Sequence, residues 1–296
     1  MRVGVVGAGG IAVPHVRAWH ELGAEVVVHS RRPPTEFAER HRTAVAADLI
    51  ELLATSDLVD VCSPTDTHDE VVLAALAAGR PVVCEKPLAR TSRRAQSLVD
   101  AARQAGVPLL PAHVVRWFPA HEALHARLVA GSLGVVDRAR FTRQVQAPPE
   151  GSWFHDVERS GGVVLDLMLH DLDQALWHFG PVRDVTATAL GPAGQAVRAV
   201  LAHDSGTTST VEATWGPAGT PFATTFEVTG SRGTARHDSM ADPAGGDAAG
   251  GGEDPYLRQA RELLDTVLTG APARVTAADG VAAVALAERV LQALGT

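Results

Sequence analysis

The first twenty residues constrain the fold of this chain more than any other segment. Arg2–Val6 is a short apolar run typical of a buried strand, and a glycine-rich loop follows it at once. The loop leads into a helical pattern that extends through His20. A strand, a tight glycine turn and a helix in this order predict the first unit of a parallel, doubly wound sheet.

Alternating strand and helix patterns continue through the first third of the chain. Further strand patterns are Glu25–Val28, Leu58–Cys62 and Val82–Cys84. The helix patterns are Asp69–Ala78 and Ser92–Ala105, and each ends at a glycine of the kind that terminates helices in the left-handed conformation. We therefore predict an α/β domain with a doubly wound parallel sheet over residues 1–117.

The pattern changes after about Phe118. One helix is expected first, and then longer β-rich runs over Val135–Val145, Val182–Leu190, Val197–Ala202, Thr207–Trp215 and Ala223–Val228. The expected helices are Pro119–Ala130, Gly162–Phe179, Pro255–Thr269 and Thr276–Leu294, with a hairpin turn at 230–233 and a flexible glycine-rich loop at 244–252. Few helices interrupt the strands, so we predict an α+β domain over 118–296 with an open, mostly antiparallel sheet.

Composition excludes several classes of function. The net charge is −8 at pH 7, which argues against nucleic acid or anionic lipid as the main partner. No apolar run approaches the roughly 20 residues of a membrane span, and the chain opens directly into a strand pattern, so we expect a cytoplasmic protein without a signal peptide. Cys62 and Cys84 lie in apolar runs and are expected to be buried thiols. No cluster has zinc-like spacing, so no metal is predicted.

The glycine loop has the spacing of a phosphate-binding turn. Gly7 permits the tight turn, Gly9 lets the backbone approach a pyrophosphate, and Ala12 lets the helix pack close to the strand. Gly10 and Ile11 open the helix, whose first N–H groups and positive dipole end favour an anion. We predict a dinucleotide site here; the alternative is a purely structural turn.

The end of the second strand favours one nicotinamide cofactor. An NAD site usually carries Asp or Glu about 20 residues after the glycines, to bind the ribose 2′-hydroxyl. Here Ser30, Arg31 and Arg32 follow the strand, and guanidinium groups suit a 2′-phosphate. We therefore predict NADP as the cofactor, with NAD also possible. The alternative interpretation is that both arginines lie on an exposed loop and have no role in cofactor binding.

Two further segments contain candidate catalytic residues. Lys86 is the only lysine beside 25 arginines, and it follows an apolar run directly. Asp166, His170, Asp173 and Trp177 fall on one stripe of the expected helix, at spacings of four, three and four. Histidine exchanges a proton near pH 7, so this stripe suits acid–base chemistry. The alternative is an ordinary surface pair on an amphipathic helix.

Together these segments resemble the Gfo/Idh/MocA family of nicotinamide-dependent oxidoreductases. The matching motifs are the glycine loop at Gly7, Ser63-Pro64-Thr65-Asp66-Thr67-His68, Glu85-Lys86-Pro87, Arg116-Trp117-Phe118-Pro119 and Asp166-x-x-x-His170. The resemblance spans essentially the whole chain. It implies a Rossmann domain followed by a substrate-binding domain whose open sheet often mediates assembly, here as a homodimer or homotetramer.

The resemblance also implies site residues. The positions that would line the cofactor are the glycine loop, Ser63, Pro64, Thr65, His68, Glu85 and Lys86. His68 is alternatively a cap of the next helix. Arg116 is expected to reach the cofactor or substrate, with a structural ion pair as the alternative. Trp153 is expected to stack on a sugar, with packing as the alternative.

Lys86, Asp166 and His170 match the catalytic and substrate-binding positions of the family. Oxidation of a carbinol requires a base for the hydroxyl proton, and His170 is the candidate. Lys86 would stabilise partial negative charge on the reacting oxygen, and Asp166 would orient His170 or Lys86. The expected substrate is a sugar, cyclitol or keto-sugar. The alternatives are a nicotinamide-dependent glycosidase and a non-catalytic sensor of NADP.

One position departs from the family pattern. Met168 replaces the glycine that usually lies two residues before the catalytic histidine. A larger side chain there is expected to narrow the substrate pocket or shift the helix, which bears on the substrate more than on the chemistry.

Overall fold

The computed structural model describes residues 1–191, 194–241 and 253–295, and its contacts divide the chain into two compact units. The first unit comprises Met1–Val114 and Tyr256–Val281, and the second comprises Val115–Pro255 and Ala282–Thr296. The sequence analysis predicted one domain boundary, after residue 117, which would put Tyr256–Val281 in the second domain. The structure instead places this segment with the first unit. The physical reason is burial, because the segment completes the core of that unit.

The first unit is built on a six-stranded parallel sheet with the order β3-β2-β1-β4-β5-β6. The strands are β1 (Arg2–Val6), β2 (Glu25–His29), β3 (Ala44–Val45), β4 (Leu58–Val61), β5 (Val82–Glu85) and β6 (Leu109–Ala112). The strand order reverses between β1 and β4. This confirms the doubly wound topology, in which ligands bind beyond the carboxyl ends of the strands at the point of reversal.

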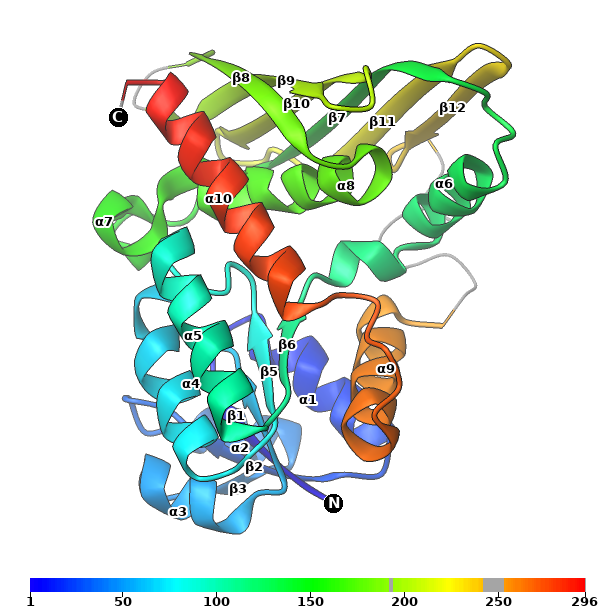
Figure 1. Cartoon of the computed structure of the whole chain (residues 1–296). Coiled ribbons are helices and arrows are strands. Elements are labelled where there is room, and N and C mark those ends of the chain that lie inside the picture. Colours follow the sequence, from blue (N-terminus) through cyan, green and yellow to red (C-terminus); the bar gives the residue numbers. More distant parts are fainter. Residues whose placement is uncertain (192–193, 242–252, 296) are drawn as a thin grey trace. The chain divides into compact units, whose positions relative to one another are not determined.

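Helices cover both faces of this sheet (Figure 1). They are α1 (Ala12–Glu21), α2 (Thr35–His41), α3 (Leu49–Thr55), α4 (His68–Ala77), α5 (Ser92–Ala105) and α9 (Pro255–Thr269). One apolar layer joins the sheet to α3, α4 and α5, and the other joins it to α1 and α9. Leu257, Ala260 and Leu263 of α9 belong to the second layer, which explains why this late segment folds with the first unit.

Local signals explain why α5 has the predicted bounds. Thr91 accepts a hydrogen bond from the N–H of Arg94 at 3.3 Å, and Gly106 ends the helix in the left-handed conformation with φ of 65°. In the first unit, the α-helices and strands that sequence patterns missed, namely α2, α3, β3 and β6, are at most seven residues long. Strand β6 contains Pro111, which a strand tolerates at the edge of a sheet.

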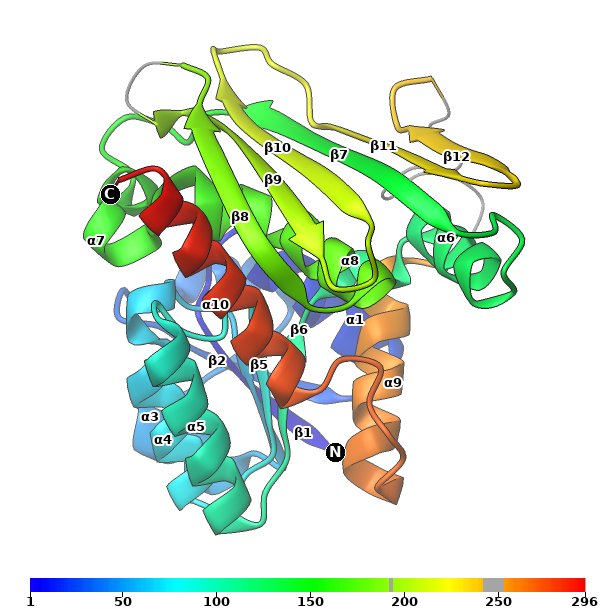
Figure 2. The same cartoon turned by 45° about the horizontal axis from the view of Figure 1, so that its top comes forward.

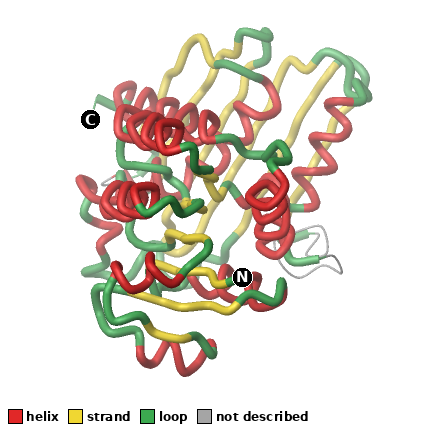
Figure 3. Tube along the Cα trace, turned by 60° about the horizontal axis from the view of Figure 1, so that its bottom comes forward, coloured by secondary structure: helices red, strands yellow, loops and turns green. Residues whose placement is uncertain are grey.

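The second unit is built on a mixed sheet with the order β12-β11-β7-β10-β9-β8, in which only β7 and β10 pair in parallel. The strands are β7 (Val136–Gln146), β8 (Val182–Ala189), β9 (Ala196–His203), β10 (Thr208–Gly216), β11 (Ala223–Gly230) and β12 (Gly233–Asp238). They run side by side in Figure 3, where strands are yellow. The mostly antiparallel sheet and the 230–233 hairpin are confirmed, and β12 is an additional strand after that turn.

Helices lie on one face of the second sheet (Figure 2). They are α6 (Pro119–Val129), α7 (Val157–Ser160), α8 (Leu169–Phe179) and the later part of α10 (Ala277–Ala293). Residues of α6, α8 and α10 form one core with alternate residues of the strands, such as Phe141 and Leu201. The glycine-rich 244–252 segment lies outside the described residues. Among those described, no helix is long and apolar enough to cross a bilayer.

Candidate functional site

Gly7 is required by the fold itself. Its φ is +119°, and a Cβ placed there would lie 2.5 Å from the carbonyl oxygen of Cys62. The N–H of Gly7 donates to the carbonyl of His29 at 2.8 Å, which ties the turn to the end of β2. The first glycine of the loop therefore packs β1 against its neighbours on both sides.

Gly9 and Gly10 have no such internal reason to be glycine. A Cβ at either position would meet no heavy atom within 4 Å, and both residues are exposed. No side chain caps the start of α1, and its first turn carries no acidic residue. Open space above the loop and an uncapped helix start are what the close approach of a pyrophosphate requires, so the loop fits a dinucleotide.

The end of β2 carries cations and no carboxylate. Ser30 donates from its hydroxyl to the carbonyl of Arg32, which shapes the turn after the strand. Arg31 and Arg32 are exposed, and neither forms an ion pair with the described residues. Glu25 lies at the opposite end of the strand, paired with Arg2. Two guanidinium groups are thus available where a cofactor ribose would bind.

The Ser63–His68 loop is held by its own hydrogen bonds. The hydroxyls of Ser63 and Thr67 lie 2.7 Å apart, and Thr67 also donates to the carbonyl of Pro64 at 2.7 Å. The buried ring of His68 has one nitrogen 2.9 Å from the Ser63 carbonyl oxygen and the other 3.0 Å from that of Pro87. Burial lowers the pKa of His68. His68 therefore ties this loop to the segment after β5.

The Glu85-Lys86-Pro87 motif begins at the carboxyl end of β5. Glu85 is buried, and its Oε2 accepts the backbone N–H of Lys86 at 3.0 Å. Lys86 is partly buried, and its bond to Pro87 is cis. The lone lysine thus lies at the carboxyl ends of the parallel strands, where doubly wound folds bind ligands.

Two residues beside this motif were missed by the sequence analysis. His15 lies on the inward face of α1, with its Nδ1 2.8 Å from Oδ2 of Asp60 and its Nε2 3.0 Å from Oε1 of Glu85. Burial opposes the protonation of His15, but Asp60 and Cys62 together raise the pKa of His15 well above its usual range. The available signal was Asp60 itself, a carboxylate within the otherwise apolar strand β4.

The segment predicted as one helix over 162–179 consists of two kinds of helix. Val164–Met168 forms a π-helical turn, and α8 begins at Leu169. Asp166 lies in the π turn and His170 in the first turn of α8, and both are partly buried. Turns of this kind occur frequently at functional sites.

Met168 occupies the core of the second unit. Its side chain is fully buried among the apolar residues between the sheet and α8. The expectation that it narrows a pocket is therefore not supported, because the side chain fills the core instead. The helix does change character at this residue, from π to α.

Arg116 forms the ion pair that was the alternative interpretation of this residue. Its Nε and Nη2 lie 2.9 and 2.6 Å from the two carboxylate oxygens of Asp173, and both side chains are buried. The guanidinium also lies 5.2 Å from the ring centroid of Trp177. The later half of the predicted polar stripe on α8 is thus engaged by Arg116.

A second buried pair on the same helix was not predicted. Arg143, from the core face of β7, makes two hydrogen bonds of 2.9 Å to Asp171. Asp171 follows His170 directly, and Asp173 lies three residues after it. Two forked pairs therefore hold the turn of α8 that carries His170.

Trp153 begins a short 3₁₀ turn and packs within the second unit. Its ring lies 4.2 Å from that of Phe154, centroid to centroid, and the guanidinium of Arg159 lies 5.9 Å from it. Trp153 is partly buried, and its role in stacking on a sugar stays a prediction.

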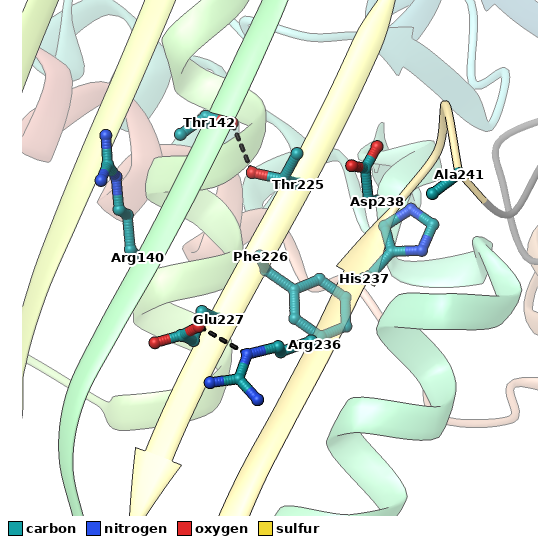
Figure 4. Close-up of a pocket in the computed structure, with 9 residues that line it drawn as sticks. All are labelled: Arg140, Thr142, Thr225, Phe226, Glu227, Arg236, His237, Asp238 and Ala241. Carbon is teal, nitrogen blue, oxygen red and sulfur yellow. Dashed lines mark hydrogen bonds and ion pairs between the residues drawn. The ribbon is translucent and has the colours of Figure 1, made fainter.

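A pocket of about 670 Å³ lies at strands β7, β11 and β12 of the second sheet (Figure 4). Among its lining residues, hydrogen bonds join Thr142 to Thr225 at 2.5 Å and Arg236 to Glu227 at 2.6 Å. The lining residues are Arg140, Thr142, Thr225, Phe226, Glu227, Arg236, His237, Asp238 and Ala241. None of the predicted site residues lines this pocket.

Comparisons with known proteins agree with both halves of the chain. The family model described as an oxidoreductase family with an NAD-binding Rossmann fold matches residues 1–113. The model described as the GFO/IDH/MocA C-terminal domain matches residues 121–236.

Individual relatives extend this similarity over the full length. A myo-inositol dehydrogenase, Hyg17 of Streptomyces leeuwenhoekii, is 34% identical over 275 residues, which cover 87% of this chain and 82% of the relative. Inositol 2-dehydrogenase of Rhizobium meliloti is 27% identical over 99% of this chain and 97% of its own. The crystal structure of GenD2 from gentamicin A biosynthesis, in complex with NAD, superimposes with a TM-score of 0.88 at 26% identity, covering 100% of this chain and 94% of that one.

Proposed function

The chain belongs to the Gfo/Idh/MocA family of oxidoreductases, and from this membership we propose that it transfers hydride between a nicotinamide cofactor and a sugar, cyclitol or keto-sugar. The observation that carries the proposal is the presence of the lone Lys86 after β5, of Asp166 in the π turn and of His170 in the first turn of α8. A chain that only sensed the cofactor would not need this set. The relatives named above are dehydrogenases of cyclitols, which supports this substrate class.

The proposed cofactor is NADP, and NAD is the alternative. The residues proposed to hold it are those of the glycine loop, the end of β2, the Ser63–Thr65 turn and Glu85. Support for NADP comes from Arg31 and Arg32, which lie free of ion pairs with described residues where an NAD site usually places a carboxylate. Guanidinium groups bind a 2′-phosphate through paired, charge-assisted hydrogen bonds.

The bound cofactor would accept or supply the hydride, and the chain's own residues would handle the proton. His170 is proposed to accept the proton of the substrate hydroxyl during oxidation and to return it during reduction. Lys86 is proposed to donate a hydrogen bond to the same oxygen and to stabilise its partial negative charge. Asp166 is proposed to orient His170 or Lys86 and to bind substrate hydroxyls.

We also propose that the chain assembles as a homodimer or homotetramer through the second sheet. The face of this sheet away from α8 carries threonines and a cross-strand ion-pair network. Glu212 of β10 lies 3.0 Å from Arg140 of β7 and 2.8 Å from Arg198 of β9. Cross-strand pairs of this kind stabilise the sheet that would form the interface. Size-exclusion chromatography with light scattering tests this state.

The test of function is a substrate panel. Oxidation with NADP⁺ and reduction with NADPH would be followed at 340 nm across sugars, cyclitols and keto-sugars. We expect turnover with at least one substrate, and a loss of about a hundredfold or more in each of His170→Ala and Lys86→Ala. Titration by NADPH fluorescence should show binding within a few-fold of wild type in both variants. Near-normal turnover in either variant would refute the role proposed for that residue.

Two negative outcomes point to the alternatives. Cleavage of a glycoside without net change in NADP(H) would indicate a glycosidase that recycles its cofactor. Tight NADPH binding without turnover of any panel member or glycoside would favour a sensor.

A further inference from the structure

Three charged side chains lie in the apolar layer between the first sheet and helix α1. His15 comes from α1, Asp60 from β4 and Glu85 from β5, and their side chains are 4%, 0% and 6% exposed. The imidazole lies within hydrogen-bond distance of both carboxylates, at 2.8 Å from Asp60 and 3.0 Å from Glu85. We call these three residues the His15 cluster. It links two neighbouring parallel strands through one ring.

The geometry favours a cationic ring. Ionised carboxylates only accept hydrogen bonds, so an imidazole protonated at both nitrogens is the form that donates to both. The raised pKa of His15 agrees with this form. Other groups that face the cluster are Trp19, whose Nε1 donates to Asp60 at 2.6 Å, and Tyr256, whose ring lies 5.6 Å from that of His15.

Cys62 also reaches the cluster, and the nitrogen, oxygen and sulfur atoms of His15, Asp60 and Cys62 lie within 4.8 Å of one another. A metal ligand would have to be a thiolate. Burial, followed by the Asp60 charge, raises the pKa of the Cys62 thiol to about 12. A protonated thiol donates a hydrogen bond to Asp60, whose Oδ1 lies 3.6 Å from Sγ, so hydrogen bonds are sufficient to hold this arrangement.

The cluster connects directly to the backbone of Lys86. The carboxylate of Glu85 meets His15 through Oε1 and accepts the Lys86 N–H through Oε2, at 3.0 Å in both cases. Glu85 cannot rotate without giving up one of these bonds. On the other side of Lys86, the Pro87 carbonyl lies 3.0 Å from the ring of His68. The lone lysine is therefore held between two buried groups.

We propose that His15 is a positioning residue for Lys86, acting through the carboxylate of Glu85. Helix α1 begins at the glycine loop, so the same helix that would receive the pyrophosphate also sets the backbone of the catalytic lysine. The proposal rests on the proposed function, which assigns Lys86 to the reacting oxygen. Misplacement of a catalytic group by about 1 Å costs up to about a hundredfold in rate.

The first test uses Lys86 as its own probe. Because Lys86 is the only lysine, reductive methylation with ¹³C-formaldehyde labels its amine and the N-terminal amine alone. In His15→Gln and Glu85→Gln we expect the ¹³C NMR signal of the Lys86 dimethylamine to shift. In the control His20→Gln, an exposed histidine on the same helix, this signal should match wild type. An unchanged Lys86 signal in both cluster variants would overturn the proposal.

The second test is a double-mutant cycle on turnover. We expect His15→Gln to lower kcat by about tenfold to a hundredfold, with NADPH affinity within a few-fold of wild type. Because His15 acts through Glu85, the double variant His15→Gln/Glu85→Gln should lie within about twofold of the slower single variant. If the loss of kcat in the double variant equals the product of the two single losses, His15 acts independently of Glu85, and the proposal is contradicted.

Two safeguards keep the outcome decisive. If His15→Gln does not fold, the NMR test uses Glu85→Gln alone, because this substitution preserves the shape of the side chain. An unchanged Lys86 signal in Glu85→Gln then refutes the proposal. If Lys86→Ala keeps its turnover, the proposed function fails, yet the Lys86 signal still decides whether His15 positions this residue. The two failures are therefore distinguishable.

Discussion

Arg116 binds Asp173 through two parallel hydrogen bonds, of 2.9 and 2.6 Å, inside the second unit. Asp173 lies three residues after His170 on α8, so this bond holds the helix close to the proposed acid–base residue. Arg143 does the same from β7 through Asp171. The helix is thus fixed in rotation by two charged pairs as well as by its apolar face.

Breaking the Arg116–Asp173 pair should destabilise the protein. Asp173→Asn leaves a buried guanidinium without its counter-ion, which typically costs about 3–5 kcal/mol. The free energy of unfolding from urea titrations measures this loss. The control is Glu36→Gln, which removes an exposed i,i+4 pair with Arg40 and should cost less than about 0.5 kcal/mol. Equal losses in the two variants would contradict the structural role of the buried pair.

Two glycines of the same loop should respond differently to alanine. Gly7→Ala forces a side chain into a φ of +119° and against the Cys62 carbonyl, so we expect a loss of at least about 2 kcal/mol in unfolding free energy. Gly9→Ala meets no protein atom within 4 Å and should leave stability unchanged. Its effect should appear as weaker NADPH binding in a fluorescence titration. Unchanged affinity in Gly9→Ala would argue against close approach of a pyrophosphate at that position.

The choice between NADP and NAD is testable at Arg31. Arg31→Ala should raise the Kd for NADPH by about tenfold or more, because a charge-assisted hydrogen bond contributes about 1.5–3 kcal/mol. The Kd for NADH should change by less than about twofold. Arg17→Ala, an exposed arginine on α1, is the matched control. Equal weakening of both cofactors would rule out the 2′-phosphate role.

The second unit should be sensitive to acid because of His178. Burial, followed by the charge of His125, lowers the pKa of His178 to about 3. In the unfolded chain His178 binds a proton near pH 6.5, whereas in the folded chain it stays neutral until about pH 3. The free energy of unfolding therefore decreases as the pH falls from 6.5 towards 3. Between pH 7 and pH 5 the loss from this group is about 2 kcal/mol.

The check on this effect is the pH dependence of the unfolding free energy in His178→Phe. Relative to wild type, this variant should lose about 2 kcal/mol less stability between pH 7 and pH 5. An exposed-site control, His20→Gln, should follow the wild-type curve. Parallel curves for wild type and His178→Phe would show that His178 is not buried in its neutral form.

Periodicity and turn residues were sufficient to predict most of the secondary structure. Arg2–Val6, Ser92–Ala105 and Pro255–Thr269 have the predicted bounds, because each combines a strong apolar pattern with a clear start or stop signal. The two-residue strand β3 and the seven-residue helices α2 and α3 carry too few residues for a period to show. Their existence depends on packing against β2 and the remaining sheet.

The sequence by itself determined the doubly wound topology of the N-terminal domain, the mostly antiparallel sheet of the C-terminal domain and the motifs that mark the family, because these depend on local patterns. Only the tertiary structure decided the partners of the buried charges. In the fold, Arg116 pairs with Asp173, Arg143 with Asp171 and His15 with Glu85. These partners are 57, 28 and 70 residues apart in the sequence. A buried charge must find a counter-charge wherever the fold provides one, and no periodicity in the chain encodes that distance.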